Sequence, residues 1–214
     1  MQDESLKVPA SVFRFNANDV EQQIPRYSAD DLRAAVDTLR RGGVILYPTD
    51  TVWGIGCDAT RSEAVKRVYE IKRRVDSKAL ITLVSSVDDL YRYVADVPTI
   101  AADLIEVSDR PLTIVYDRGI NLAPELLAAD GSVGLRVTGE AFSAALCRGL
   151  RRPVVSTSAN ISGCPTPASF AEISPEIVDA VDYVVQYRRD DRRPARPSSV
   201  IKLGADSTVK IIRP

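Results

Sequence analysis

The chain has 214 residues and a formal net charge of −1, with 45% hydrophobic and 27% charged residues. These values fit one globular domain, or a domain with a small annex, that buries a sizeable core. The near-zero charge argues against a generally basic nucleic-acid-binding surface but leaves a local basic patch open. No window has the apolar length of a signal peptide or a membrane span, so we expect a cytoplasmic protein with no membrane partner.

Two residue types limit the chemistry further. The sequence contains no histidine, which excludes Ser-His-Asp and Cys-His catalysis and every zinc site that needs imidazole. The cysteines Cys57, Cys147 and Cys164 are widely spaced and form no CxxC pair. They indicate neither a disulfide framework nor a metal site, and we expect no metal held by the protein's own side chains. Proton transfer must therefore use carboxylates, lysine, tyrosine, water or the substrate itself.

The first regular element is predicted to be a helix that begins at Ser28. Asp31 follows three residues later, which is the spacing of a capping box with Asp in place of Glu. Gly42 and Gly43 end the helix after a basic last turn. An apolar strand is expected next, at residues 44–47.

Further along the chain, Thr60 and Glu63 repeat the capping-box spacing and predict a second helix that ends at 72–74. Other strands are expected at 12–15, 80–84, 112–115, 133–137, 154–156, 183–186, 200–203 and 209–212. Other helices are expected at 88–93, 99–107, 140–150 and 175–181. We predict an N-terminal arm over 1–27 and a single α/β domain over 28–214, with a twisted mixed sheet and flanking helices.

A polar loop follows the strand at 44–47. Pro48 breaks the strand, and Thr49, Asp50 and Thr51 come next. A hydroxyl-rich loop after a strand is a common way to hold polar groups over a pocket. The same residues also suit the turn of a hairpin, so both interpretations stay open.

A cluster of cations ends the second helix. Lys72, Arg73, Arg74 and Lys78 place four basic residues within seven positions. Cations here can stabilise the carboxyl end of the helix dipole. They can equally clamp a polyphosphate or a carboxylate.

Small polar residues follow the strand at 154–156, in the run STSANISG at 156–163. Hydroxyls and an amide at the carboxyl end of a strand are well placed for a ligand, although Ser and Asn also stabilise turns. The sequence has no Walker phosphate loop and no GxGxxG opening a helix. A nucleotide would therefore be held by side chains and turn amides, with Asn160 and the cation cluster as its main contacts.

The segment 188–197, RRDDRRPARP, combines five arginines with two aspartates. It could form a lid over a nucleotide, an RNA contact or a solvated surface. The absence of aromatic residues within it argues against a stacking platform for single-stranded RNA.

Three of these segments together carry a resemblance to a known family. They are YPTDTVWGIG at 47–56, Lys72-x-Arg74 with Lys78, and Ser158-x-Asn160 within SANISG. The chain resembles the YrdC/Sua5 family, the threonylcarbamoyl-AMP synthases, in the short form without the C-terminal Sua5 domain. The resemblance covers nearly the whole chain. It implies a YrdC-like twisted α/β fold with a concave, positively charged cavity.

The resemblance also implies a role for individual residues. Those implied to bind threonine are Thr51, Ser158 and Ser198. Those implied to bind ATP are Arg74, Lys78, Thr113, Asn160 and Arg213. Lys72 and Arg74 are implied to be catalytic, because cations can neutralise an attacking carboxylate and a leaving pyrophosphate.

The implied reaction joins L-threonine, bicarbonate and ATP into threonylcarbamoyl-AMP and releases pyrophosphate. Mg²⁺ is expected to be bound through the phosphates of ATP. The carbamate formed from threonine and bicarbonate would attack the α-phosphorus, so no protein nucleophile is needed. The product would serve t6A formation at position 37 of tRNA through a separate transfer enzyme, and direct tRNA binding stays open.

Four positions depart from the family pattern. Ala79 replaces the usual proline, and Leu83 stands where some members have a histidine beside threonine. Ala168 replaces a common threonine, and Asp117 falls where others place a basic residue. These departures concern the shape of the threonine pocket more than the ATP clamp.

Two other functions remain as alternatives. The first is a non-catalytic tRNA- or rRNA-binding module that uses the cavity and the 188–196 loop. The near-neutral charge argues against it. The second is a carbamoyl-transferring domain of hydrogenase maturation, which normally sits inside a much larger chain.

Overall fold

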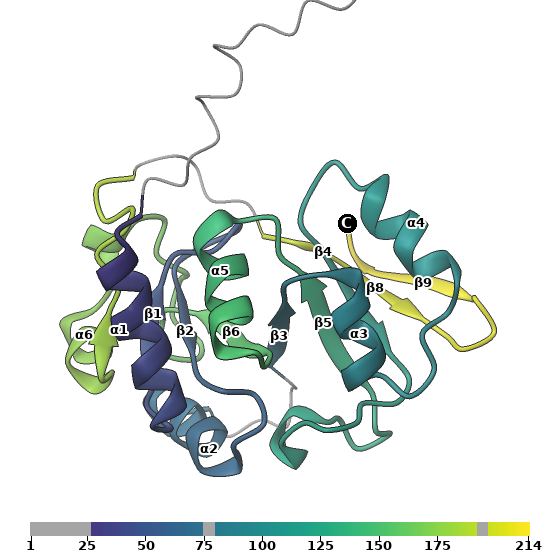
Figure 1. Ribbon diagram of the computed structural model, residues 1–214, viewed down its shortest axis with the longest axis horizontal. Helices are drawn as coiled ribbons and strands as arrows, with labels where there is room; N and C mark the ends of the chain where they lie inside the picture. The colour runs from purple at the N-terminus through teal and green to yellow at the C-terminus, as the bar shows by residue number, and fades with distance from the viewer. Residues whose placement is uncertain (1–26, 75–79, 192–196) are drawn as a thin grey trace, which may run out of the picture.

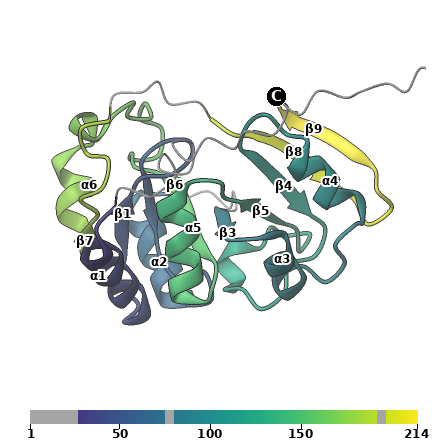
Figure 2. The same ribbon diagram turned by 45° about the horizontal axis from the view of Figure 1, so that its top comes forward.

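A mixed β-sheet organises the computed structural model, which describes residues 27–74, 80–191 and 197–214. Within these residues the sheet has nine strands in the order β7-β1-β2-β6-β3-β5-β4-β8-β9. Figure 2 shows β7 and β9 at its opposite edges. The strands are β1 Ile45–Tyr47, β2 Gly54–Gly56, β3 Ile81–Val84, β4 Leu112–Tyr116, β5 Val133–Val137, β6 Val154–Ser158, β7 Tyr183–Val184, β8 Ser199–Leu203 and β9 Val209–Arg213.

The strand pairing is mixed, as predicted. Parallel pairs are β1 with β7, β3 with β5, and β4 with β8. Antiparallel pairs are β1 with β2, β2 with β6, β3 with β6, β4 with β5, and β8 with β9. Strand β6 therefore joins the early hairpin to the strands of the second half of the sheet.

Six α-helices flank the sheet within the described residues (Figure 1). They are α1 Ala29–Arg40, α2 Ser62–Ile71, α3 Val87–Tyr93, α4 Ile100–Glu106, α5 Ala141–Leu150 and α6 Pro175–Ala180. Two short 3-10 turns, η3 Pro124–Leu126 and η4 Phe170–Glu172, lie in the connections. No helix of the described residues is both long and apolar enough to cross a membrane.

The core consists of three apolar clusters. In one, α1 and α5 pack on β1, β3 and β6, and in another α2 and α6 pack on β1, β2 and β6. In the third, α3 and α4 pack on β4, β5 and β8. Helices α1 and α2 bury one apolar side against the sheet, whereas α5 is buried all round over residues 142–147.

The two predicted capping boxes have different outcomes. Ser28 is the N-cap of α1, and its Oγ accepts from the backbone N–H of Asp30 at 3.2 Å and of Asp31 at 3.5 Å. The carboxylate of Asp31, however, accepts from Tyr183 Oη at 2.6 Å instead of reaching back to the cap. A partner 152 residues away therefore replaces the local bond.

The second capping box is wrong. The N-cap of α2 is Arg61, which makes no side-chain cap bond. Thr60 instead donates its Oγ1 to Asp58 Oδ1 at 2.7 Å, because the fully buried Asp58 needs donors. The predicted strand at 12–15 and most of the arm at 1–27 lie outside the described residues, so the domain boundary stays a prediction.

Candidate active site

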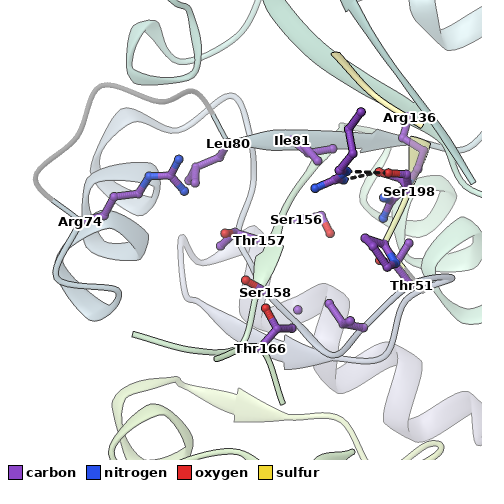
Figure 3. Close-up of a pocket in the computed structure, with 14 residues that line it drawn as sticks. Thr51, Arg74, Leu80, Ile81, Arg136, Ser156, Thr157, Ser158, Thr166 and Ser198 are labelled. Atoms are coloured by element: carbon purple, nitrogen blue, oxygen red, sulfur yellow. Dashed lines mark hydrogen bonds between the residues drawn. The ribbon is translucent and has the colours of Figure 1, made fainter. Parts of the chain in front are cut away.

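A cavity of about 330 Å³ opens where β2, the end of β6 and the start of β3 meet the segment before β8 and the end of β9 (Figure 3). Its lining includes hydroxyl groups, apolar side chains and three arginines, and no acidic residue among those that the structure describes. The lining residues are Thr51, Val52, Gly54, Arg74, Leu80, Ile81, Arg136, Ser156, Thr157, Ser158, Thr166, Pro197, Ser198 and Arg213. We call this space the main cavity.

Thr51 reaches the main cavity from the loop between β1 and β2. The buried Thr49 organises this loop: its Oγ1 donates to the carbonyl of Val52 at 2.7 Å and accepts from the N–H of Thr51 at 3.0 Å. The two threonine hydroxyls are 3.0 Å apart. Arg188 Nη1 also donates to the carbonyl of Thr49 at 3.0 Å. The loop is thus held by its own hydroxyls and by Arg188, with Thr51 at the cavity wall.

Lys72 does not line the main cavity. It lies beside it, in an adjoining cavity of about 490 Å³ that also contacts Arg74, Ser158 and Asn160. Its Nζ donates to the carbonyls of Ser158 at 2.5 Å and of Asn160 at 2.7 Å. Burial, and secondarily the charge of Arg74, lowers the pKa of Lys72 to about 8.

The three cations at the end of α2 point in different directions. Arg73 has a left-handed backbone, with φ of 48°, and its side chain forms an ion pair with Glu176. Arg74 projects toward the main cavity near Leu80 (Figure 3) and also lines the adjoining one. Lys72 and Arg74 are therefore brought together, and Arg73 is turned away. Lys78 lies outside the described residues.

The Ser-x-Asn segment begins at Ser158, the last residue of β6. Ser158 lines both cavities. The Nδ2 of Asn160 donates to the carbonyls of Ile161 at 3.0 Å and of Cys164 at 2.7 Å, so this amide stabilises its own turn. Its buried Oδ1 has no hydrogen-bond partner within the described part of the chain. Asn160 thus closes the turn and still carries one unused acceptor.

The late residues of the chain form a second polar group. Arg213 donates from Nε to the carbonyl of Ser198 at 3.0 Å and from Nη2 to its Oγ at 3.2 Å (Figure 3). The Oγ1 of Thr113 lies 3.0 Å from the same Oγ. Ser198 and Arg213 line the main cavity, whereas Thr113 is only 1% exposed and lies behind Ser198. A direct contact between Thr113 and ATP stays a prediction.

Arg136 is a cavity residue that the sequence interpretation missed. Its side chain is only 3% exposed, and Nη2 pairs with Asp50 Oδ1 at 2.9 Å. Thr138 Oγ1 donates to the other oxygen of Asp50 at 3.3 Å. Burial lowers the pKa of Arg136 and the charge of Asp50 opposes this change, so the guanidinium stays protonated at neutral pH. The sequence feature that could have identified Arg136 is a charged residue inside an otherwise apolar strand.

Three of the four departures from the family pattern lie in described residues. Leu83 is fully buried in the cluster under α1 and α5 and does not line the main cavity. Ala168 lines a separate small space near Arg188. Asp117, directly after β4, pairs with Lys202 at 3.4 Å. Ala79 lies outside the described residues.

The donor set does not fit a Mg²⁺ ion held by the protein. No group of three or more Cys, Asp or Glu side chains comes together within the described residues. Asp50, the carboxylate next to the cavity, is already paired with Arg136. Magnesium prefers carboxylate and phosphate oxygens, so in this site the phosphates of a ligand would have to supply them.

Comparison with known proteins identifies the family. A family model described as Telomere recombination, for Sua5, YciO and YrdC proteins, matches residues 37–214. The chain belongs to the Sua5/YciO/YrdC family. Among curated relatives, the threonylcarbamoyl-AMP synthase of Xanthomonas campestris pv. campestris strain B100 is 36% identical over an alignment of 166 residues, and the match covers 72% of this chain and 84% of the relative.

Solved structures of this family share the fold. P. abyssi Sua5 complexed with L-threonine has a TM-score of 0.77 and 27% identity, covering 89% of this chain and 55% of its own. The chain thus spans about half of that protein. E. coli YciO has a TM-score of 0.71 and 26% identity, covering 85% of this chain and 87% of its own. These matches confirm the predicted family and its α/β fold.

Proposed function

We propose that the chain is an L-threonylcarbamoyladenylate synthase, which makes threonylcarbamoyl-AMP and pyrophosphate from L-threonine, bicarbonate and ATP. The observation that carries this proposal is the main cavity, where Arg74, Arg136 and Arg213 surround hydroxyl groups without an acidic residue among the described lining. The names of the relatives support it, since one is a threonylcarbamoyl-AMP synthase and another was crystallised with L-threonine.

Threonine fits the side of the cavity that holds Arg136. The amino acid has a carboxylate, which matches a buried guanidinium fixed by Asp50. It also has a hydroxyl, for which Thr51, Ser158 and Ser198 offer partners. The family resemblance assigned these three hydroxyl residues to threonine, and Arg136 adds a positive charge, which this set of hydroxyl groups lacks.

ATP fits the side that holds Arg74, where the two cavities meet. Arg74 and Lys72, with Lys78 from the sequence, would face the triphosphate, and Asn160 and Arg213 would hold the nucleotide. Thr113, which is hydrogen-bonded to Ser198, is assigned to ATP by the family resemblance, and this contact stays a prediction. Bound Mg²⁺ would arrive with the phosphates and neutralise part of their charge.

The chemistry then needs no protein nucleophile. The amine of threonine attacks bicarbonate and water leaves, which gives the carbamate. The carbamate oxygen forms a bond to the α-phosphorus of ATP while the bond to the pyrophosphate oxygen breaks. Charge develops on the leaving pyrophosphate and is redistributed at the α-phosphoryl group, so cations held in place before the reaction stabilise the transition state. Lys72 and Arg74 supply this charge, and Lys72 also fixes the turn that carries Ser158 and Asn160.

The proposal includes a role in tRNA t6A37 modification, with transfer by a separate enzyme. Since the reaction consumes ATP and serves tRNA, we infer a cytoplasmic location. The test is pyrophosphate release with L-threonine, bicarbonate or ATP omitted in turn. Release that requires all three supports the synthase. No release, together with tRNA binding that weakens steeply with salt, would favour the RNA-binding module instead.

A further inference from the structure

A second cavity, of about 300 Å³, lies away from the main cavity. It is lined by Val84 and Ser85 at the end of β3 and by Pro153 just before β6. The main cavity uses the start of β3 and the end of β6. Because β3 and β6 are antiparallel, the two cavities lie at opposite ends of this pair. Figures 1 and 2 show α3 and α5 on either side of β3.

Four arginines line this second space, which we call the arginine cavity. Arg92 comes from α3, and Arg148, Arg151 and Arg152 come from the last turn of α5 and the residues after it. Asp89 is the one carboxylate in the described lining, and it already accepts from Ser85 Oγ at 2.6 Å. In a chain with 28 basic and 29 acidic residues, this is a local concentration of positive charge.

Two of the four arginines have acidic partners, and two have none among the described residues. Arg152 pairs with the buried Asp58 at 2.8 Å, and Arg92 approaches Asp89 at 3.8 Å. The side chains of Arg148 and Arg151 form no ion pair or hydrogen bond with any residue that the structure describes. Guanidinium groups without partners around one concave space suit an anionic ligand.

The helix dipole explains only part of this cluster. Cations at the carboxyl end of α5 are favoured by the dipole, which accounts for Arg148. The dipole of α3 accounts in the same way for Arg92, which lies in the last turn of that helix. Neither dipole explains why Arg151, at φ 60° in the left-handed region, is not the glycine that such a position favours.

We propose that the arginine cavity binds a small phosphorylated molecule, with Arg148 and Arg151 as its main phosphate ligands. A volume of about 300 Å³ is that of a small-ligand pocket. All four arginines line this one hollow, an arrangement that suits a small anion. The aromatic side chain in its lining, Tyr93, is 8% exposed, so it offers no open ring for base stacking.

The test uses inorganic pyrophosphate as the probe, labelled with ³²P and measured by equilibrium dialysis. The main cavity also offers cations, so both proteins compared carry Arg74→Ala. Adding Arg148→Gln and Arg151→Gln should weaken the remaining pyrophosphate binding by about tenfold or more, since two charge-assisted contacts are lost. A matched control, Arg33→Gln with Lys66→Gln, removes two exposed charges from α1 and α2 and should leave binding within about twofold.

Three outcomes would overturn the proposal. The first is equal pyrophosphate binding with and without Arg148→Gln and Arg151→Gln, and the second is an equal loss of binding in the control variant. The third is an RNA oligonucleotide that binds through Arg148 and Arg151 when pyrophosphate does not. Thermal melting checks the fold of each variant. Arg151→Gly gives a further check, because glycine suits the φ of 60° and removes the charge without straining the backbone. It should also weaken pyrophosphate binding.

Discussion

At the scale of single residues, the ammonium of Lys72 lies between two backbone carbonyls instead of in open water. The residue is 2% exposed, and its partners are the carbonyls of Ser158 and Asn160. Its sequence position predicted a cation that faces phosphate. The structure adds a second role, because the same ammonium holds the turn that carries two other candidate ligands.

Lys72→Ala should lower kcat/KM about a hundredfold or more. The substitution removes a positioned charge and leaves two carbonyls without their donor, and losses of this size are typical of electrostatic groups in active sites. Lys66→Ala is the control, because Lys66 is half exposed on α2 and pairs with Glu63. Steady-state pyrophosphate release measures both. Equal activity in the two variants would contradict the role assigned to Lys72.

The pH dependence should reveal the same ammonium. Burial lowers the pKa of Lys72 to about 8, so its charge is present below this pH and is lost as the pH rises through it. The kcat/KM of the free enzyme should therefore fall above pH about 8. Lys72→Arg keeps a guanidinium that stays protonated, so its alkaline limb should move upward. If the limb keeps its position in Lys72→Arg, another group causes it.

Arg136 shows where sequence reasoning on single residues stops. Its neighbours Val133, Leu135 and Val137 predicted a buried strand, and that strand forms as expected. The sequence could not predict whether the guanidinium of Arg136 binds a ligand or an internal carboxylate, because its partner Asp50 is far away in the sequence. Ser158 and Arg74 were predicted because each belongs to a short local motif.

At the scale of elements, the close packing of β2 depends on Gly56. A Cβ at this position would lie 2.5 Å from the carbonyl oxygen of Val155 and 2.6 Å from Cε1 of Tyr47. The neighbours are backbone and a fully buried ring, so neither can move easily. This glycine brings the hairpin of β1 and β2 against β6 and so positions Thr51.

Gly56→Ala should lower the free energy of unfolding by about 2 kcal/mol or more, because overpacking forces backbone shifts. Gly134→Ala in β5 is the matched control, since its nearest contact would be Thr113 Cγ2 at 3.6 Å, an ordinary distance. Urea denaturation of both variants measures the difference. A similar stability for the two would show that β2 and β6 can separate at little cost.

Asp31 ties α1 to the segment after β7. Its carboxylate accepts from Tyr183 Oη at 2.6 Å and from the N–H groups of Gln186 and Tyr187 at 3.0 Å. Asp31→Ala should therefore destabilise the protein by about 3 kcal/mol, because several partly buried donors lose their acceptor. Asp30→Ala, in the same turn but exposed beside Arg33, should cost only about 0.5 kcal/mol. Chemical denaturation that gives equal losses would contradict this account.

Most elements could be predicted because their signals are local. The alternation of apolar residues and the positions of glycine and proline gave nearly all strands and helices within one or two residues. The helix caps were less predictable, since Asp31 and Thr60 bind to Tyr183 and to the buried Asp58 instead of to their own helices. The hydrogen-bond partners of these side chains depend on the tertiary fold, which the local spacing of residues does not predict.

At the scale of the whole molecule, the sheet order assembles the candidate site. Strand β6 pairs with both β2 and β3, which brings Thr51, Ser158 and Ile81 to one cavity. The segment before β8 then adds Ser198, and β9 adds Arg213. The motifs grouped the candidate site residues, and the family resemblance assigned them to threonine or ATP. The contact of Thr113 with Ser198 and the pairing of Asp50 with Arg136 could be found only from the fold.

The most direct test of the proposed synthase is the identity of its product. The protein would be incubated with ATP, L-threonine and ¹³C-labelled bicarbonate, and the adenylates would be separated and weighed by mass spectrometry. The account predicts threonylcarbamoyl-AMP that carries the label, formed together with pyrophosphate and absent when threonine is omitted. Cleavage of ATP without a labelled threonine adenylate would contradict it.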